Sequence, residues 1–251
     1  MKILILGHKG LLGRDIIEFN KFFKQHEIAT IDELYRWPDI NFKHIVKKID
    51  CDIIINCISI ENFENINQVK SIYFDLPLFL SEIKNKYVIN FTSDILNSSA
   101  KKMPDVNNYY LFKKNAEKIL NPGSFLNVRT SFFGLSNTKS NLLNKKFNNS
   151  STIIGYTNLK WSGVTTLQIY HSIANFIEII QNNISKINLS SECISNYDLL
   201  VTINEVFGFK HEVTKKIYIN SESRCSKSDL IIPNITTQIK DLFELKSHFQ
   251  N

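Results

Sequence analysis

The sequence has few of the residues that mark metal-bound or disulfide-rich domains. Its 251 residues include four cysteines, Cys51, Cys57, Cys193 and Cys225, and no two of them form a CxxC pair. The spacing therefore predicts neither a zinc site nor a redox motif, and the scattered histidines add no metal-ligand set. We interpret Cys51 and Cys57, which flank an apolar run, as buried thiols. A reducing, cytoplasmic location is the simplest interpretation.

Long hydrophobic runs are also missing. No stretch approaches the roughly 18 to 20 apolar residues of a membrane span, so we expect no membrane segment. The first residues, MKILILG, lead into a glycine turn and not into a cleavage site. This start predicts a first strand and no signal peptide.

Positive charge is in excess but is not concentrated. The formal net charge is +6, yet no dense Lys/Arg block and no basic stripe with interleaved aromatics occurs. This distribution argues against a nucleic-acid partner. A small ligand that carries phosphate fits the charge equally well.

Short apolar runs alternate with amphipathic stretches through the first half of the chain. The expected strands are residues 2–6, 28–31, 52–58, 87–91 and 124–128, and the expected helices are residues 11–23, 42–49, 66–83 and 109–120. This rhythm predicts an α/β fold, a Rossmann-type doubly wound parallel sheet. Right-handed crossovers leave few other topologies.

The rhythm loosens after about residue 135, where we expect helices at residues 167–180, 197–207 and 236–245. We therefore divide the chain into an NAD(P)-binding Rossmann domain over residues 1–150 and a small substrate-binding lobe over residues 151–251. The lobe is expected to fold back in part onto the sheet.

Three of the eight glycines stand directly after the first expected strand. The segment, called the glycine turn below, is Gly7, His8, Lys9, Gly10, Leu11, Leu12 and Gly13. Its GxxGxxG spacing between a strand and a helix is typical of a dinucleotide site. Glycine permits the tight turn, the approach of a pyrophosphate and close helix packing, and the helix start supplies N–H groups for the phosphates. We expect all seven residues to bind NAD or NADP.

The residues after the second strand leave the choice of cofactor open. Asp32 lies where a carboxylate binds the ribose hydroxyls of NAD. Arg36, four residues on, would instead pair with the 2′-phosphate of NADP. The sequence supports both.

A polar cluster and a Tyr/Lys pair follow the fourth strand. Ser93 and Asp94 stand at the carboxyl end of that strand, the edge where ligands bind. A Tyr with a Lys four residues later places both side chains on one helix face. A neighbouring ammonium favours the phenolate and lowers the phenol pKa from about 10, which makes the phenol a proton donor or acceptor near neutral pH.

Two registers fit this pairing, Tyr109 with Lys113 and Tyr110 with Lys114. The apolar face of the helix, which includes Ala116, decides between them. At about 100° per residue, Tyr109 and Lys113 flank that face, whereas the other pair points toward solvent. We choose Tyr109 and Lys113.

These segments together resemble the extended short-chain dehydrogenase/reductase family, and within it the dTDP-4-dehydrorhamnose reductase group. The similarity spans about residues 1 to 245. The matching segments are the glycine turn, residues 52–57, 92–94, 109–117, 128–134 and 161–167.

The resemblance implies a function and a set of site residues. It implies catalysis by Ser93, Tyr109 and Lys113, and substrate contacts from Ser93, Asp94 and Trp161. Cofactor contacts are implied for Cys57, Ile58, Ser59, Thr130 and Ser131. The implied reaction is NAD(P)H-dependent reduction of a nucleotide 4-keto-6-deoxysugar for surface polysaccharide biosynthesis, by a possible homodimer with a nucleotide-sugar substrate.

Two alternatives stay open. One is a nucleotide-sugar epimerase or dehydratase that uses the same site with tightly bound cofactor. The other is a non-catalytic subunit that binds the cofactor or the sugar nucleotide and regulates a partner, because a fold alone does not establish catalysis.

Overall fold

The computed structural model describes residues 1–32, 34–60, 62–97, 104–119, 123–136, 141–147, 152–219 and 223–249. The chain divides into two compact units, each assembled from separate segments. The first unit comprises Met1–Thr92, Lys101–Arg129 and Ser172–Ile187, and the second comprises Ser93–Ala100, Thr130–His171 and Asn188–Asn251. The single boundary expected after residue 150 falls within the middle segment of the second unit.

The first unit is built on a six-stranded sheet. Its strands are β1 (Lys2–Leu6), β2 (Glu27–Thr30), β3 (Ile53–Asn56), β4 (Tyr87–Phe91), β5 (Phe125–Arg129) and β10 (Lys186–Asn188), in the order β10-β5-β4-β3-β1-β2. The four pairings from β2 to β5 are parallel. All four residues of β3 are buried, which explains why its three isoleucines follow one another and do not alternate with exposed polar residues. The predicted doubly wound parallel sheet is confirmed.

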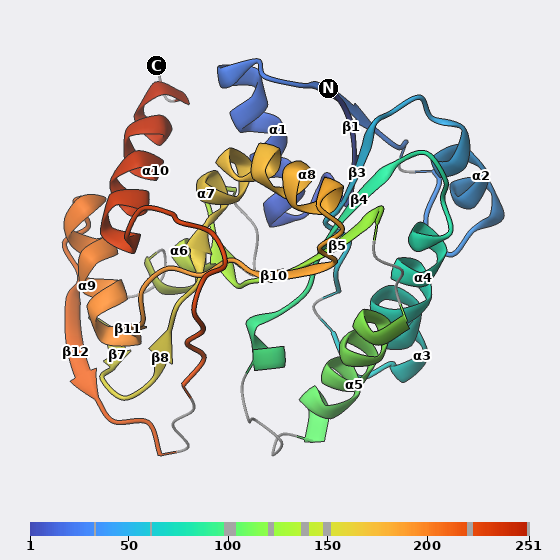
Figure 1. The fold of residues 1–251 in the computed structure, drawn as a ribbon. Coiled ribbons are helices and arrows are strands. Elements are labelled where there is room, and N and C mark those ends of the chain that lie inside the picture. Colours follow the sequence, from blue (N-terminus) through green and yellow to red (C-terminus); the bar gives the residue numbers. More distant parts are fainter. Residues whose placement is uncertain are drawn as a thin grey trace. The chain divides into compact units, whose positions relative to one another are not determined.

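Helices cover both faces of this sheet (Figure 1). They are α1 (Leu11–Phe23), α2 (Ile40–Lys48), α3 (Ile66–Lys70), α4 (Leu76–Ser81), α5 (Pro104–Ile119) and α8 (Ile173–Gln181). One face buries Leu4 and Ile54 against Val46 of α2, Leu80 of α4 and Ala116 of α5. Figure 1 shows α1 and α8 on the opposite face. Successive residues of a strand point to opposite faces, so the continuously apolar strands supply both cores.

The sheet order reverses beside β1. The chain passes from β1 to β2 on one side and later returns to β3 on the other. Ligands of open α/β sheets bind at such a switch point, outside the carboxyl ends of the strands. The glycine turn follows β1 at this point, and the Cys57 amide just beyond β3 donates a hydrogen bond to the Leu6 carbonyl at 2.9 Å.

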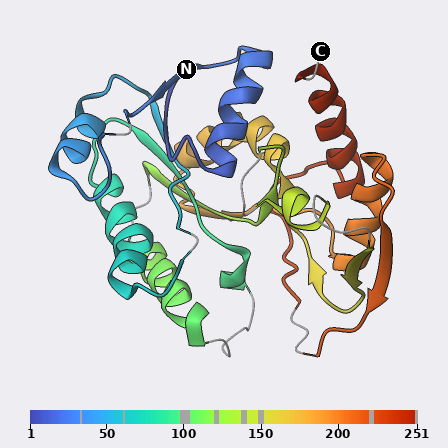
Figure 2. The same cartoon turned by 180° about the vertical axis from the view of Figure 1, so that it is seen from behind.

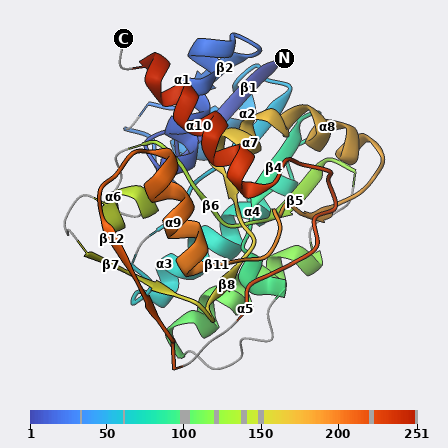
Figure 3. The same ribbon diagram turned by 90° about the vertical axis from the view of Figure 1, so that its left-hand side faces the viewer.

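Over its described residues, the second unit contains three two-stranded sheets. They pair β6 (Phe132–Phe133) with β9 (Val164–Thr165), β8 (Lys160–Trp161) with β11 (Ile194–Ser195), and β7 (Thr152–Tyr156) with β12 (Glu212–Lys216). Its helices are α6 (Leu142–Phe147), α7 (Thr166–His171), α9 (Asn196–Val206) and α10 (Ile235–Phe249). Helix α9 packs on β7 and β12 (Figure 2), and α10 packs on α9 (Figure 3).

A disulfide joins Cys193 to Cys225 in the second unit, which the sequence analysis did not predict. Disulfides are rare in reducing compartments, so this pair does not support the location inferred from cysteine spacing. Cys51 and Cys57 are free thiols, and Cys51 is buried as expected whereas Cys57 is half-buried. Of the helices in the described ranges, none has the length and apolarity that a membrane crossing needs.

Two expected helices are interrupted. Residues 66–83 form α3, a π-helical turn at Ser71–Asp75 and then α4. Residues 167–180 form α7 and α8, which meet at Ser172 and belong to different units.

Candidate active site

Two glycines of the glycine turn are required by the packing of the first unit. Gly7 has a φ of +79°, and a Cβ there would stand 2.7 Å from the carbonyl carbon of Cys57. A Cβ on Gly13 would stand 2.5 Å from the Gly7 carbonyl oxygen. Gly10 differs, because its φ is −72° and its Cβ would meet its nearest atom at an ordinary 3.4 Å. The packing therefore explains why residues 7 and 13 are glycines, whereas a side chain at position 10 would meet only ordinary contacts.

The start of α1 is suited to an anion. Among the described residues, no side chain caps this helix and none in its first turn is acidic. The N–H groups of a helix start carry partial positive charge and have no partner within the helix. His8 is half-buried, and Lys9 is exposed beside Gly10. Leu12 is a core residue at 4% exposure, so only its backbone is placed to meet a ligand.

Asp32 and Arg36 are both exposed after β2. One carboxylate oxygen of Asp32 accepts a hydrogen bond from the Leu34 amide at 3.0 Å and closes a local turn. The contacts of Asp32 with a ribose and of Arg36 with a 2′-phosphate stay predictions.

The segment after β3 lies against the glycine turn. The backbone of Cys57 and Ile58 fills the space where a Gly7 side chain would be. Burial raises the pKa of the Cys57 thiol, which keeps it protonated at neutral pH. Ile58 is half-buried and packs beside Tyr73, whereas Ser59 is exposed.

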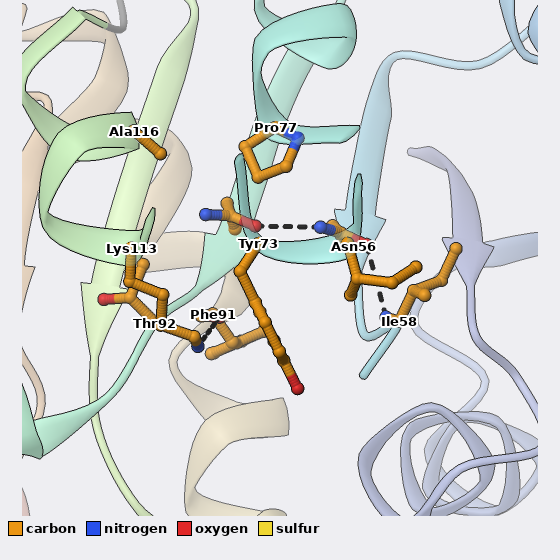
Figure 4. Close-up of a pocket in the computed structure, with 10 residues that line it drawn as sticks. Asn56, Ile58, Tyr73, Pro77, Phe91, Thr92, Lys113 and Ala116 are labelled. Atoms are coloured by element: carbon orange, nitrogen blue, oxygen red, sulfur yellow. Dashed lines mark hydrogen bonds between the residues drawn. The ribbon is translucent and has the colours of Figure 1, made fainter. Parts of the chain in front are cut away.

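Lys113 is buried at the carboxyl end of β4. It is 6% exposed, and its Nζ donates to the Phe91 carbonyl at 3.4 Å. The Nζ also lies 4.9 Å from the ring centroid of Tyr109 and 4.8 Å from that of Tyr73. Figure 4 shows Lys113 and Tyr73 side by side in a pocket that includes Phe91.

The neighbouring pair lies on the outer side of α5. Lys114 donates to the Tyr110 hydroxyl at 3.1 Å in an exposed bond. The helix thus places Lys113 inward and Lys114 outward, the arrangement that the chosen register requires. The catalytic roles of Tyr109 and Lys113 stay predictions.

Three buried asparagines form a hydrogen-bonded ladder across the sheet, two of them line the pocket, and sequence reasoning missed the ladder. The Asn56 side-chain amide donates to Asn90 at 2.8 Å, and the Asn90 amide donates to Asn127 at 2.9 Å. The three residues are 4%, 4% and 1% exposed. Each lies on one of three adjacent strands, so the ladder fixes the strand ends on which the site is built.

An ion pair fixes α5 against the same strands. Arg129 Nη2 lies 2.5 Å from a carboxylate oxygen of Glu117, and these side chains are 17% and 5% exposed. Glu117 also accepts from the Thr92 hydroxyl at 3.0 Å. The contacts tie the helix that carries Lys113 to the ends of β4 and β5.

Ser93 and Asp94 belong to the second unit. The Ser93 hydroxyl donates to Asp94 at 3.2 Å, and the other Asp94 oxygen accepts from Ser131 at 2.9 Å. Asp94 is 6% exposed, so its carboxylate orients two hydroxyls of the chain. Thr130 is buried as well, and its hydroxyl donates to the Ser131 carbonyl at 3.3 Å. Substrate contact by Asp94 stays a prediction.

Trp161 is a packed residue of β8. Its ring lies 6.2 Å from that of Phe133, and its indole occupies the space beside Gly163 where a Cβ would clash. It is half-buried, so part of its surface stays accessible. The described part of the chain holds no cluster of three or more His, Cys, Asp or Glu able to bind a metal ion.

Comparison with known proteins identifies the fold. No protein-family model and no curated protein sequence matches the chain. A dTDP-4-dehydrorhamnose reductase from Clostridium acetobutylicum superposes with a TM-score of 0.75 at 18% identity, covering 98% of this chain and 100% of that one. The Bacillus anthracis reductase in complex with NADP gives a TM-score of 0.79 at 15% identity, covering 97% and 98%.

The chain has the fold of these reductases. A dTDP-glucose 4,6-dehydratase from Bacillus anthracis in complex with NAD also superposes, with a TM-score of 0.69 at 11% identity over 99% of this chain and 97% of that one. The resemblance inferred from the sequence is therefore confirmed at the level of the fold.

Proposed function

We propose that the chain is an NAD(P)H-dependent reductase of a nucleotide 4-keto-6-deoxysugar. The observation that carries the proposal is the buried ammonium of Lys113 over the ring of Tyr109, at the carboxyl edge of a sheet whose first strand ends in the glycine turn. Solved structures of the same fold, named as reductases of this type, support it.

The glycine turn fits a dinucleotide. The space above Gly10, the uncapped start of α1 and the exposed Lys9 suit a pyrophosphate. The fold itself would accept a side chain at Gly10. The close approach of a ligand is therefore a sufficient reason for a glycine at this position. The nicotinamide, when bound, supplies the hydride for the reduction.

The chain's own residues handle the proton. Tyr109 donates it to the keto oxygen, which becomes a hydroxyl. Lys113 stabilises the phenolate that remains, and a buried ammonium does so more strongly than one in water. In this proposal the Ser93 hydroxyl, which donates to Asp94 in the structure, turns its one proton to the same keto oxygen when substrate binds. Trp161 borders the sugar nucleotide in this proposal.

The test is a panel of nucleotide 4-keto sugars incubated separately with NADH and NADPH and followed at the nicotinamide absorbance band. Tyr109→Phe should lower kcat by about 10²- to 10⁴-fold, the usual contribution of a positioned proton donor. Tyr110→Phe is the matched control, because its hydroxyl binds Lys114 on the outer side of α5, and it should keep wild-type activity. Equal activities of the two variants would refute the assigned roles, and product without net cofactor consumption would indicate the epimerase or dehydratase reaction instead.

We also propose a cytoplasmic homodimer that acts in surface polysaccharide biosynthesis. Size-exclusion chromatography with light scattering tests the dimer, and a single-chain mass would contradict it. The Cys193–Cys225 pair tests the location. In a reducing cytoplasm the pair would be recovered as two thiols when cells are lysed under alkylating conditions, whereas recovery as a disulfide would contradict that location.

A further inference from the structure

Tyr73 lies in the same pocket as Lys113 but has no role in the proposed function (Figure 4). It is 7% exposed and belongs to the π-helical turn between α3 and α4. Its hydroxyl accepts from the Ile60 amide at 3.1 Å and donates to the Ile60 carbonyl at 3.2 Å. A phenol has one proton to donate, and here the backbone after β3 takes it. Burial also raises the pKa of Tyr73, so it stays a neutral phenol.

The Tyr73 ring meets the two residues assigned to proton transfer. It packs edge-to-face on Tyr109, with ring centroids 4.7 Å apart and an interplanar angle of 87°. The Lys113 ammonium lies at nearly equal distances from both rings, 4.8 Å and 4.9 Å. Phe63 packs against both tyrosines, at 6.2 Å and 5.2 Å. An ammonium near two ring centroids is attracted by both rings, and more strongly where water is excluded.

We propose that Tyr73 is a positioning residue that holds the Lys113 ammonium beside Tyr109. This inference rests on the proposed function. A lysine side chain has four rotatable bonds, and fixing it costs conformational entropy. The attraction between the Tyr73 ring and the ammonium offsets part of that cost, and the Tyr73 hydroxyl is bonded to the backbone of Ile60.

The π-helical turn that carries Tyr73 is itself anchored by hydrogen bonds. The Trp37 indole N–H donates to the Ser71 carbonyl at 3.0 Å and to the Ser71 hydroxyl at 2.8 Å, at the first residue of the turn. Leu76 ends the turn with its amide bonded to the same carbonyl. Tyr73 thus lies in a π turn whose first residue is anchored by Trp37, and π turns inside helices are frequent at functional sites.

Two substitutions separate the ring from its hydroxyl. Tyr73→Phe keeps the ring over Lys113 and removes the bonds to Ile60. Tyr73→Leu keeps an apolar side chain and removes the ring. Should the Leu variant fail to fold by circular dichroism, Tyr73→Met serves the same purpose, because it fills irregular space without an aromatic face.

The first readout is the titration of Tyr109 itself, followed by NMR of protein labelled with ¹³C at the tyrosine Cζ. The Tyr109 signal is the one that Tyr109→Phe removes. We expect its midpoint to rise by about one pH unit in Tyr73→Leu, because an ammonium that is no longer held stabilises the phenolate less. Tyr73→Phe should leave the midpoint within a few tenths of a unit.

The second readout is catalysis. Misplacement of a catalytic group by about 1 Å can cost on the order of 10²-fold in rate. Tyr73→Leu should therefore lower kcat by about 10- to 100-fold, with the basic limb of its pH profile displaced to higher pH and the KM for the sugar within about threefold. The separate variant Tyr73→Phe should keep kcat within about threefold of wild type.

The readouts distinguish two kinds of failure. If the wild-type chain reduces no keto sugar, the proposed function fails, and the Tyr109 titration still decides the role of Tyr73. If the wild type is active and Tyr73→Leu leaves both the midpoint and kcat unchanged, the positioning role is refuted. Equal losses in the Phe and Leu variants would also refute it, because the ring would then not be the part that acts.

Discussion

Single glycine-to-alanine changes in the glycine turn should separate folding from ligand binding. A Cβ at Gly7 would lie 2.7 Å from the Cys57 carbonyl carbon, about 0.7 Å inside the 3.4 Å lower limit of ordinary contact. Both atoms belong to backbone, so β1 and β3 must separate at their carboxyl ends. Such overpacking costs about 1–3 kcal/mol. The φ of +79° adds about 1–2 kcal/mol for any residue with a Cβ.

Gly7→Ala should therefore lower the free energy of unfolding by about 2–5 kcal/mol. For a chain of this size each kcal/mol shifts Tm by about 2–4 °C, so the Tm should fall by about 4–20 °C. Gly208→Ala is the matched control, because Gly208 has a φ of +67° and nothing within 4 Å of its Cβ. It should show the backbone cost alone, about 1–2 kcal/mol. The difference between the two variants isolates the clash.

Gly10→Ala should behave in the opposite way. Its Cβ meets ordinary contacts and its backbone suits any residue, so stability should change by no more than about 1 kcal/mol. The added methyl group stands where a pyrophosphate would approach the start of α1. We expect at least about a tenfold increase in the Kd for NADPH, measured by nucleotide fluorescence at a temperature where each variant is folded. A Gly10→Ala chain that binds NADPH like wild type would refute the dinucleotide site, and a Gly7→Ala chain as stable as wild type would refute the packing argument.

Three further predictions concern stability and packing. Glu117→Gln should lower the free energy of unfolding in urea by about 3 kcal/mol, because it removes the carboxylate charge that faces the largely buried Arg129, and an unchanged midpoint would contradict this. Gly163→Ala should displace Trp161 from its position and change its fluorescence spectrum, since the new Cβ would occupy the space of the indole; an unaltered spectrum would contradict the packing. Burial lowers the pKa of His26, so the unfolded chain binds a proton more readily below about pH 6.5 and stability should fall as pH drops through that value; His26→Gln should reduce this dependence, and an unchanged pH–Tm curve would oppose it.

Elements with purely local signals could be predicted with their bounds. Strands β1 and β4 and helix α1 begin and end where the sequence analysis placed them. In each case a run with one period ends at a turn residue or a change of period, and such signals lie within a few residues. The helix expected over residues 167–180 illustrates the limit. Its apolar pattern continues across Ser172, but the two halves pack in different units, and only tertiary contacts decide that division.

The same limit explains which parts of the candidate site could be found from the sequence. Tyr109 and Lys113 are one helical turn apart, so their shared face follows from helix geometry alone. Tyr73 reaches them from another helix, and it does so through a π turn that an apolar pattern with helical spacing does not reveal. The residues that hold a proton-transfer pair in place are thus harder to predict than the pair itself.

The asparagine ladder could have been predicted from the sequence if the strand order had been known. Asn56 and Asn90 were both visible as polar residues near the ends of apolar strands, and Asn127 lies one residue before the last position expected for its strand. Their contact depends on strand order, since β3, β4 and β5 must be neighbours with these residues in register, as they are. A parallel sheet in that order places polar residues near successive carboxyl ends within hydrogen-bonding distance, and burial then requires that they pair. Once a doubly wound sheet is predicted, polar side chains at the ends of its central strands can therefore be tested as a group for the base of a ligand site.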